Sequence, residues 1–382
     1  MVGKDGRAMK KRDFDMHTLI RPDLLDLPGY VPIVPTDILA ERFGIAASDV
    51  IKLDGNENPF GPSPKALAAI ANERAYHIYP DPDQRKVREA LARHLDSDIE
   101  RIVCGLGSDD LIDLILRAVI LHGDGVINCS PTFGMYPFST EIAGGRVIDV
   151  PRLESFALDV DAVEKAAPGA KLIFVASPNN PTGQRMSTDE LDRLLATGLL
   201  VVVDEAYIEF AGAHGSPASA VPLVRTHENL VVLRTFSKWA GLAGLRAGYG
   251  VMSPVLAAVL MTIKQPYNLN VAAGIAMIAS IEDRELLDER ACIITGTRER
   301  LSVLLSEISW ITPYPSEANF ILCRLDGVDA VEVKDRLAKR GIFVRHFDSA
   351  RLRNHLRISV GLEEHNAPVV AALKEIGAEL GR

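Results

Sequence analysis

Residues 199–207, LLVVVDEAY, form an apolar run that ends in two acidic residues. Comparable runs are KLIFVAS (171–177) before it and NLVVLRTFS (229–237) after it. Continuous runs of Val, Ile and Leu are typical of strands in a parallel sheet that helices cover on both faces. Earlier runs of this kind are RIVCG (101–105), GVINC (125–129) and RVIDV (146–150), and helical patterns such as 109–122 lie between them. The sequence therefore predicts an α/β fold.

The pattern changes after about residue 281. A long charged helical stretch over 283–308 precedes the apolar run NFILCRL (319–325), a helix around 329–340 and the runs GIFVRHF and HLRISV. This order predicts a smaller α+β domain. The first 55 residues have weak periodicity and several prolines. We therefore expect an N-terminal arm over 1–55 that packs on the small domain, a large domain over 56–282 and a small domain over 283–382.

Composition excludes some classes of function. The net charge of −9 over 382 residues leaves no broad basic field for nucleic acid or an anionic membrane. No apolar run reaches membrane-spanning length, and the charged N-terminus is unlike a secretory signal. The four cysteines are far apart and lack metal-ligand spacing, so we expect no metal site and free thiols in a reducing cytoplasm.

Polar residues follow four of the predicted strands. The segments are Leu106-Gly107-Ser108-Asp109, SPNNPTG (177–183), Asp204-Glu205-Ala206-Tyr207 and Thr235-Phe236-Ser237-Lys238. In open α/β sheets, ligands bind outside the carboxyl ends of the strands. The sequence thus predicts that these groups meet at one edge of the sheet.

Each segment has a chemical interpretation and a plain one. The turn at Gly107 feeds a helix N-terminus, which suits a phosphate, although a simple helix cap explains it equally. Asp204 ends a buried strand and could pair with a protonated pyridine nitrogen, or with a structural cation. Lys238 lies eight residues before Arg246, and a nearby cation in a dry site lowers the pKa of an amine. Most lysines, however, lie on solvated surfaces, and a half-buried Tyr207 is more often packing.

Taken together, the segments resemble the fold-type I aminotransferases that depend on pyridoxal 5′-phosphate (PLP), and within them the histidinol-phosphate aminotransferase group. The matching stretches include KLDGNENPFGPSP (52–64), YPDP (79–82), GLGSDDLIDL (105–114), SPTFGMY (130–136), SPNNPTG (177–183), VVVDEAYIEF (201–210), RTFSKWAGLAGLRAGY (234–249), SEANFIL (316–322) and HLRISVG (355–361). The resemblance covers the chain from about residue 20 to its end. It implies a large domain with a mostly parallel sheet of the seven-stranded type between helices, and a smaller α+β domain.

The resemblance also implies roles for single residues. Lys238 would form the Schiff base with PLP and move the substrate proton, and Asp204 would hold the pyridinium nitrogen. Asn180 and Tyr207 would bind the phenolic oxygen. Phe133 stands where the group usually has a stacking tyrosine. The phosphate would be surrounded by Gly107, Ser108, Asp109 through its backbone N–H, Thr235, Ser237 and Arg246. Tyr79 would reach the phosphate of a neighbouring subunit, which implies a homodimer with shared active sites.

On the substrate side, Arg357 matches the arginine that binds the α-carboxylate, and a guanidinium fork suits phosphate equally. Arg345 matches an arginine for the phosphate of histidinol phosphate, or it is a surface strand residue. Tyr30 and Asn56 match further substrate positions. We expect transamination of L-histidinol phosphate with 2-oxoglutarate in histidine biosynthesis. An aromatic amino-acid aminotransferase, a PLP lyase such as a decarboxylase of a phosphorylated amino acid, and a non-catalytic PLP-fold protein remain alternatives, with a Rossmann dehydrogenase more distant.

Overall fold

The fold is described from a computed structural model that covers residues 14–211 and 219–382. The chain divides into two compact units, Met1–Pro32 and Ile33–Arg382, and each is described by itself. The described part of the first unit contains a short 3₁₀ helix, Met16–Thr18, and helix α1, Pro22–Leu25. The second unit contains every sheet of the described residues.

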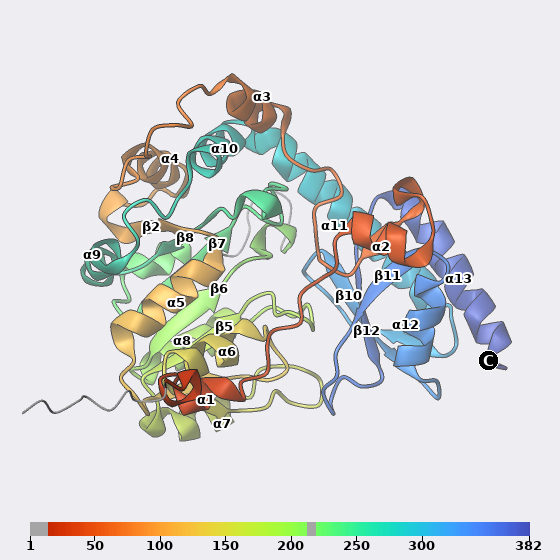
Figure 1. The fold of residues 1–382 in the computed structure, drawn as a ribbon. Helices are drawn as coiled ribbons and strands as arrows, with labels where there is room; N and C mark the ends of the chain where they lie inside the picture. The colour runs from red at the N-terminus through yellow and green to blue at the C-terminus, as the bar shows by residue number, and fades with distance from the viewer. Residues whose placement is uncertain (1–13, 212–218) are drawn as a thin grey trace, which may run out of the picture. The chain divides into compact units, whose positions relative to one another are not determined.

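A seven-stranded sheet forms the larger part of the second unit (Figure 1). Its strands are β2 (Ile102–Gly105), β3 (Gly125–Asn128), β4 (Arg146–Asp149), β5 (Leu172–Ala176), β6 (Leu200–Asp204), β7 (Leu230–Thr235) and β8 (Gly248–Val251), in the order β2-β8-β7-β6-β5-β3-β4. All neighbouring strands are parallel except β8, which runs antiparallel to β2 and β7. The predicted α/β class and mostly parallel sheet are confirmed. The six apolar runs are six of its strands, whereas β8, GYGV, contains too little aliphatic sequence to be recognised as one.

Helices cover both faces of this sheet, because successive side chains of a buried strand point to opposite sides. On β5, Ile173 and Val175 pack into one core and Leu172 and Phe174 into another. The first core also contains residues of α3 (Pro64–Asn72), α4 (Arg85–Leu95), α7 (Val160–Ala166), α8 (Thr188–Ala196) and α10 (Val271–Glu282). The second contains residues of α5 (Ser108–Val119), α6 (Met135–Ile142) and α9 (Pro254–Ile263).

A five-stranded sheet forms the smaller part of the unit. Its strands are β1 (Ile51–Leu53), β9 (Ile311–Pro313), β10 (Phe320–Leu325), β11 (Ile342–His346) and β12 (His355–Ser359), in the order β1-β11-β12-β10-β9. Its core includes side chains of α11 (Arg284–Ser306), α12 (Ala330–Ala338) and α13 (Asn366–Glu379). Helix α2 (Thr36–Phe43) precedes β1, which pairs in parallel with β11. The chain thus contributes to the small sheet before it builds the large one. The division at residues 55 and 282 stays a prediction.

None of the helices in the described residues is long and apolar enough to cross a membrane.

Candidate active site

The sheet register brings the predicted polar segments to one edge. Asp204, the last residue of β6, is paired with Ala176 of β5 on one side and with Leu233 of β7 on the other. Strand β8 lies between β2 and β7, so that Gly248 is opposite both Gly105 and Thr235. The loop that follows Gly105 therefore starts beside the end of β7.

Helix α5 begins at Ser108, directly after Gly107, which has a φ of 80°. A side chain is poorly tolerated at such a φ, and an added Cβ would lie 2.8 Å from Arg246 Nη2. Arg246 donates a hydrogen bond to Asp109 Oδ2 at 2.9 Å. A Cβ on Gly248 would lie 2.5 Å from the carbonyl carbon of Gly107, so glycine is needed at this close approach. The result is a helix N-terminus with a guanidinium beside it, an arrangement suited to a dianion.

Two hydroxyl groups lie at the end of β7. Thr235 Oγ1 lies 2.9 Å from Ser237 Oγ and accepts a hydrogen bond from the backbone N–H of Ser237 at 3.0 Å. Both residues are buried. Because Thr235 is opposite Gly248, which lies close to Gly107, the end of β7 is near the start of α5. The predicted phosphate-binding residues are thus brought together.

Asp204 is a buried carboxylate with two hydrogen-bond donors. Its Oδ1 accepts from the N–H of Ala206 at 3.1 Å, and its Oδ2 accepts from the phenol of Tyr136 at 2.8 Å. Burial raises the pKa of Asp204 to about 6, despite these two donors. A cation beside this carboxylate would offset part of the free energy that burial of its charge requires.

Lys238 follows β7, and its Nζ donates to the carbonyl of Gly55 at 3.1 Å. The same nitrogen lies 6.0 Å from the centre of the Tyr207 ring. Burial, together with the positive charges of Arg357 and Arg246, lowers the pKa of the Lys238 amine to about 8. A substantial share of the amine is therefore neutral near physiological pH, as a nucleophile or base requires.

Residues 54–58, which follow β1, connect the small sheet to this edge. Asn56 Nδ2 donates to Tyr207 Oη at 3.1 Å, and Asn58 Nδ2 donates to the carbonyl of Trp239 at 2.7 Å. Ser359 Oγ donates to Asn56 Oδ1 at 2.7 Å. The sequence predicted Asn56 at the site, but not the carbonyls of residues 54 and 55. A backbone acceptor carries no side-chain signal that a sequence could reveal.

Arg357 on β12 joins residues predicted for the cofactor to those predicted for the substrate. Its Nη1 donates to Asn180 Oδ1 at 2.6 Å, and its Nη2 donates to the carbonyl of Asp54 at 2.5 Å. Its guanidinium lies over the ring of Phe320 at 5.3 Å and that of Phe347 at 5.5 Å. These contacts fix the direction of the fork.

Arg345 on β11 is opposite Arg357 in the antiparallel register. Side chains of such a pair point to the same face of the sheet, a few ångströms apart, and like charges there are destabilising. The Arg345 guanidinium lies 5.8 Å from the centre of the Phe347 ring, which is also in contact with Arg357. An anion between the two arginines would offset their repulsion.

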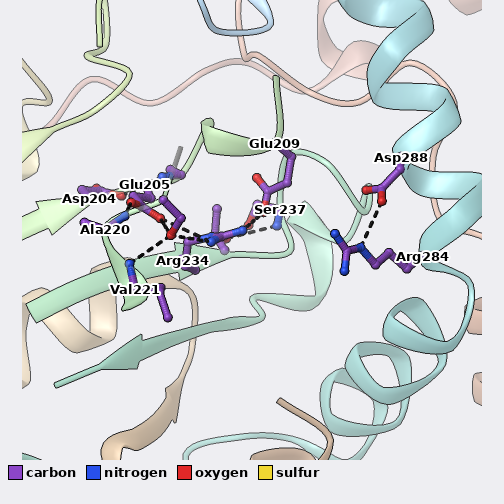
Figure 2. Close-up of polar contacts among 12 residues, drawn as sticks. Asp204, Glu205, Glu209, Ala220, Val221, Arg234, Ser237, Arg284 and Asp288 are labelled. Carbon is purple, nitrogen blue, oxygen red and sulfur yellow. Dashed lines mark hydrogen bonds and ion pairs between the residues drawn. The ribbon is translucent and has the colours of Figure 1, made fainter. Parts of the chain in front are cut away.

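A buried ion cluster joins the ends of β6 and β7. Figure 2 shows Arg234 between Glu205 and Glu209, with ion-pair distances of 3.3 and 2.6 Å. Burial alone would lower the pKa of Arg234, but the two carboxylates outweigh it and keep that pKa above its ordinary value. Glu205 directly follows Asp204, and Arg234 directly precedes Thr235. The cluster therefore fixes two strand ends that carry predicted site residues. In the sequence, the only sign of this cluster is that charged residues occur within apolar runs.

Three predicted residues are less closely tied to this edge. The Phe133 ring meets that of Tyr136 edge-on at 5.5 Å. The Tyr79 side chain is 76% exposed and stacks on Tyr267, with ring centres 4.4 Å apart. Tyr30 belongs to the first unit, so its place at the site stays a prediction. Tyr136 lies in the SPTFGMY stretch, three residues after Phe133, but the sequence did not indicate its contact with Asp204.

Residues 48–373 match the family described as Aminotransferase class I and II. The chain belongs to this family. It is 49% identical over 371 residues to the histidinol-phosphate aminotransferase of Roseiflexus castenholzii, a match that covers 94% of this chain and 98% of that protein. It is 44% identical over 361 residues to histidinol-phosphate aminotransferase 1 of Arabidopsis thaliana, covering 94% and 86%.

Solved aminotransferase structures agree. The histidinol-phosphate aminotransferase of Sinorhizobium meliloti, determined in complex with PLP, superposes with a TM-score of 0.84 at 28% identity, covering 98% of this chain and 99% of that one. The resemblance to the histidinol-phosphate aminotransferase group and the fold-type I architecture are therefore confirmed. Class I and II aminotransferases of this fold are PLP enzymes.

The residues of this aminotransferase fit PLP chemically. A phosphate ester suits the start of α5, where Gly107 and Gly248 leave no room for a Cβ and Arg246 supplies a cation. A pyridinium nitrogen suits the buried carboxylate of Asp204. The amine of Lys238, whose pKa is lowered to about 8, suits attack on an aldehyde.

Proposed function

We propose that this protein transfers the amino group of L-histidinol phosphate to 2-oxoglutarate, giving imidazole acetol phosphate and L-glutamate, in histidine biosynthesis. The two relatives described above, at 49% and 44% identity, are named histidinol-phosphate aminotransferase. The observation that carries the substrate assignment is the pair Arg345 and Arg357, which face each other across β11 and β12. An aminotransferase that alternates between a phosphate ester and a dicarboxylate requires cationic groups at the substrate position in both half-reactions.

PLP, when bound, supplies the electron sink for chemistry at the substrate α-carbon. Lys238 would hold the cofactor and would accept the substrate α-proton at its Nζ, which is mostly neutral above pH 8. Asp204 holds the pyridinium nitrogen as a buried counter-ion. Tyr207 and Asn180 bind the phenolic oxygen of the cofactor, and Asn56 supports the Tyr207 hydroxyl at 3.1 Å.

The remaining proposed contacts are those with the phosphate and the ring. The phosphate is held by Gly107, Ser108, the backbone N–H of Asp109, Thr235, Ser237 and Arg246. Phe133 stacks on the cofactor ring without contributing a hydroxyl. Asn56 belongs to the substrate side, and the role of Tyr30 stays a prediction from the sequence. Arg357, already directed by Asn180 and Asp54, binds the carboxylate of glutamate and the phosphate of the other substrate in turn, while Arg345 serves the phosphate.

Substrate exchange in separate half-reactions tests this function against its rivals. Histidinol phosphate alone should remove the visible absorption band of the PLP-loaded protein, and 2-oxoglutarate should restore it. A response to phenylalanine or tyrosine only would assign an aromatic aminotransferase, and release of carbon dioxide would assign a decarboxylase. If PLP added to the protein produced no visible band, the enzyme assignment would be wrong.

We also propose a homodimer with shared sites, in which Tyr79 reaches the phosphate bound by its partner. Tyr79 is exposed and is oriented by stacking on Tyr267, which supports a contact with a neighbouring subunit. Hybrids of Lys238→Ala and Tyr79→Ala subunits test this directly. If the sites are shared, one site in each hybrid combines an intact Lys238 with an intact Tyr79, so mixing restores tight PLP binding and activity. Mixing without any gain would contradict shared sites.

For the compartment, we propose the cytoplasm. The support is chemical: the four cysteines are free, and Cys104, Cys129 and Cys323 are buried. Free thiols persist in a reducing environment. Fractionation of the source cells would test this, and recovery of the protein outside the cytoplasm would contradict it.

A further inference from the structure

Tyr136 is a wholly buried residue at the start of α6, with 1% of its surface exposed. Its ring is parallel to that of Phe174 on β5, with an interplanar angle of 6° and ring centres 5.0 Å apart. Its other side meets Phe133 edge-on at 5.5 Å. Two aromatic contacts on different elements leave the ring little freedom to rotate.

The phenol of Tyr136 is directed at the carboxylate of Asp204. The oxygen atoms lie 2.8 Å apart, and the phenol can only donate, because an ionised carboxylate only accepts. Burial, followed by the charge of Asp204, raises the pKa of Tyr136 well above its ordinary value, so the proton remains on the phenol. The phenol is therefore the donor whenever Asp204 is ionised.

The other groups around Asp204 act differently. The N–H of Ala206 donates to the opposite oxygen at 3.1 Å. Two acidic neighbours, Asp109 on α5 and Glu205 next to Asp204 in the chain, act in the opposite direction and raise the pKa of Asp204. Tyr136 is thus the side-chain donor that opposes burial and acidic neighbours.

We propose that Tyr136 is a positioning residue that keeps Asp204 ionised and directed for the pyridinium nitrogen of PLP. This inference rests on the proposed role of Asp204. One oxygen of the carboxylate is held by Ala206 and the other by Tyr136, which fixes its plane. Because the Tyr136 ring also contacts Phe133, the proposed stacking residue, one side chain links that residue with the proposed partner of the pyridinium nitrogen.

Tyr136→Phe removes only the hydroxyl and keeps the aromatic contacts. In the apoprotein, the carboxyl of Asp204 should then titrate at higher pH than the value of about 6 expected for the wild type. The infrared carboxyl band that is absent in Asp204→Asn reports this titration without any cofactor. The affinity of the apoprotein for PLP should fall about tenfold at neutral pH, as expected for one hydrogen bond to a charged group. The loss should narrow at pH 9, where Asp204 is ionised in both proteins.

Tyr314→Phe is the matched control. It removes a half-buried phenol that lies 3.4 Å from His355 Nε2 and has no contact with Asp204. It should leave both the carboxyl titration and the pH profile of PLP affinity unchanged. If Tyr136→Phe also leaves the titration unchanged, the proposal is overturned, even if the variant is less stable.

Failure of the underlying role of Asp204 has a different signature. If Asp204→Asn binds PLP as tightly as the wild type, Asp204 is not the pyridinium partner. The infrared titration would still show whether Tyr136 controls the charge of Asp204. A shifted titration combined with unchanged PLP affinity in Tyr136→Phe would overturn the positioning role while preserving the contact.

Discussion

The edge of the large sheet and the β11–β12 pair of the small sheet arrange their charged groups differently. On the large sheet, Asp204, Arg246 and Arg234 each have partners that stabilise their charge. Asp204 has two donors, Arg246 is paired with Asp109, and Arg234 lies between two carboxylates. On the small sheet, Arg345 and Arg357 are opposite each other with like charges. Charges paired within the protein suit a cofactor that stays bound, whereas two cations on neighbouring strands can both bind an anionic substrate that arrives and leaves.

The largest effect should come from Lys238, which we assign both to cofactor binding and to the substrate proton. Lys238→Ala should lower kcat about ten-thousandfold, the upper range for removal of a general base, because no other amine replaces its Nζ. The variant should retain its fold, since Lys238 donates only to the carbonyl of Gly55 among the bonds assigned to it. Steady-state turnover and far-UV circular dichroism measure the two effects. Retained transamination would refute the role of Lys238.

The two regions also differ in how far the sequence predicted them. The large-sheet site was predictable because its residues follow continuous apolar runs, and Asp204 and Lys238 each stand at a fixed distance from one. The pairing of those runs in the sheet then brings their ends together at one edge. What the sequence could not predict depends on long-range packing: the carbonyls of residues 54 and 55, Tyr136 against Asp204, and the strand β8.

The arginine pair illustrates the other limit. Arg345 and Arg357 were each predicted from the resemblance, but their direct opposition follows from an antiparallel register across 12 residues of sequence, which no local pattern encodes. The surface-strand interpretation of Arg345 is consistent with its place on β11 as well. Only its measured effect on each substrate separates the two interpretations.

The compensation on the large sheet can be broken at Arg234. Arg234→Met leaves Glu205 and Glu209 buried without their shared cation, which should cost about 3–5 kcal/mol in the free energy of unfolding. Denaturant unfolding of the apoprotein measures this loss. Arg193→Met is the control, because Arg193 pairs with two carboxylates at an exposed position, and its loss should be far smaller. Equal losses would show that burial of the cluster is unimportant.

Asp204 gives a prediction with a definite pH dependence. Its pKa is about 6 in the folded protein and near 3.8 when exposed, so the folded state binds the extra proton between these values. The stability contributed by Asp204 therefore falls as pH rises through this window, by up to about 3 kcal/mol. Apo Asp204→Asn should be more stable than the wild type above pH 6, with the difference vanishing below pH 4. A constant difference at all pH values would contradict a raised pKa.

The smallest effect should come from the small sheet, and it decides the substrate. Arg345→Ala should raise the KM for histidinol phosphate about 10- to 100-fold, as expected for loss of a charge-assisted hydrogen bond, and alter the KM for glutamate much less. Arg345→Lys should restore only part of the affinity for histidinol phosphate, because the lysine ammonium lacks the planar guanidinium fork. Arg324→Ala is the control and should change neither KM, because Arg324 is exposed on β10, beyond β12, and pairs with Asp326. If Arg345→Ala raises the KM for both substrates equally, the two arginines act as one general anion site. Arg345 would then not select histidinol phosphate.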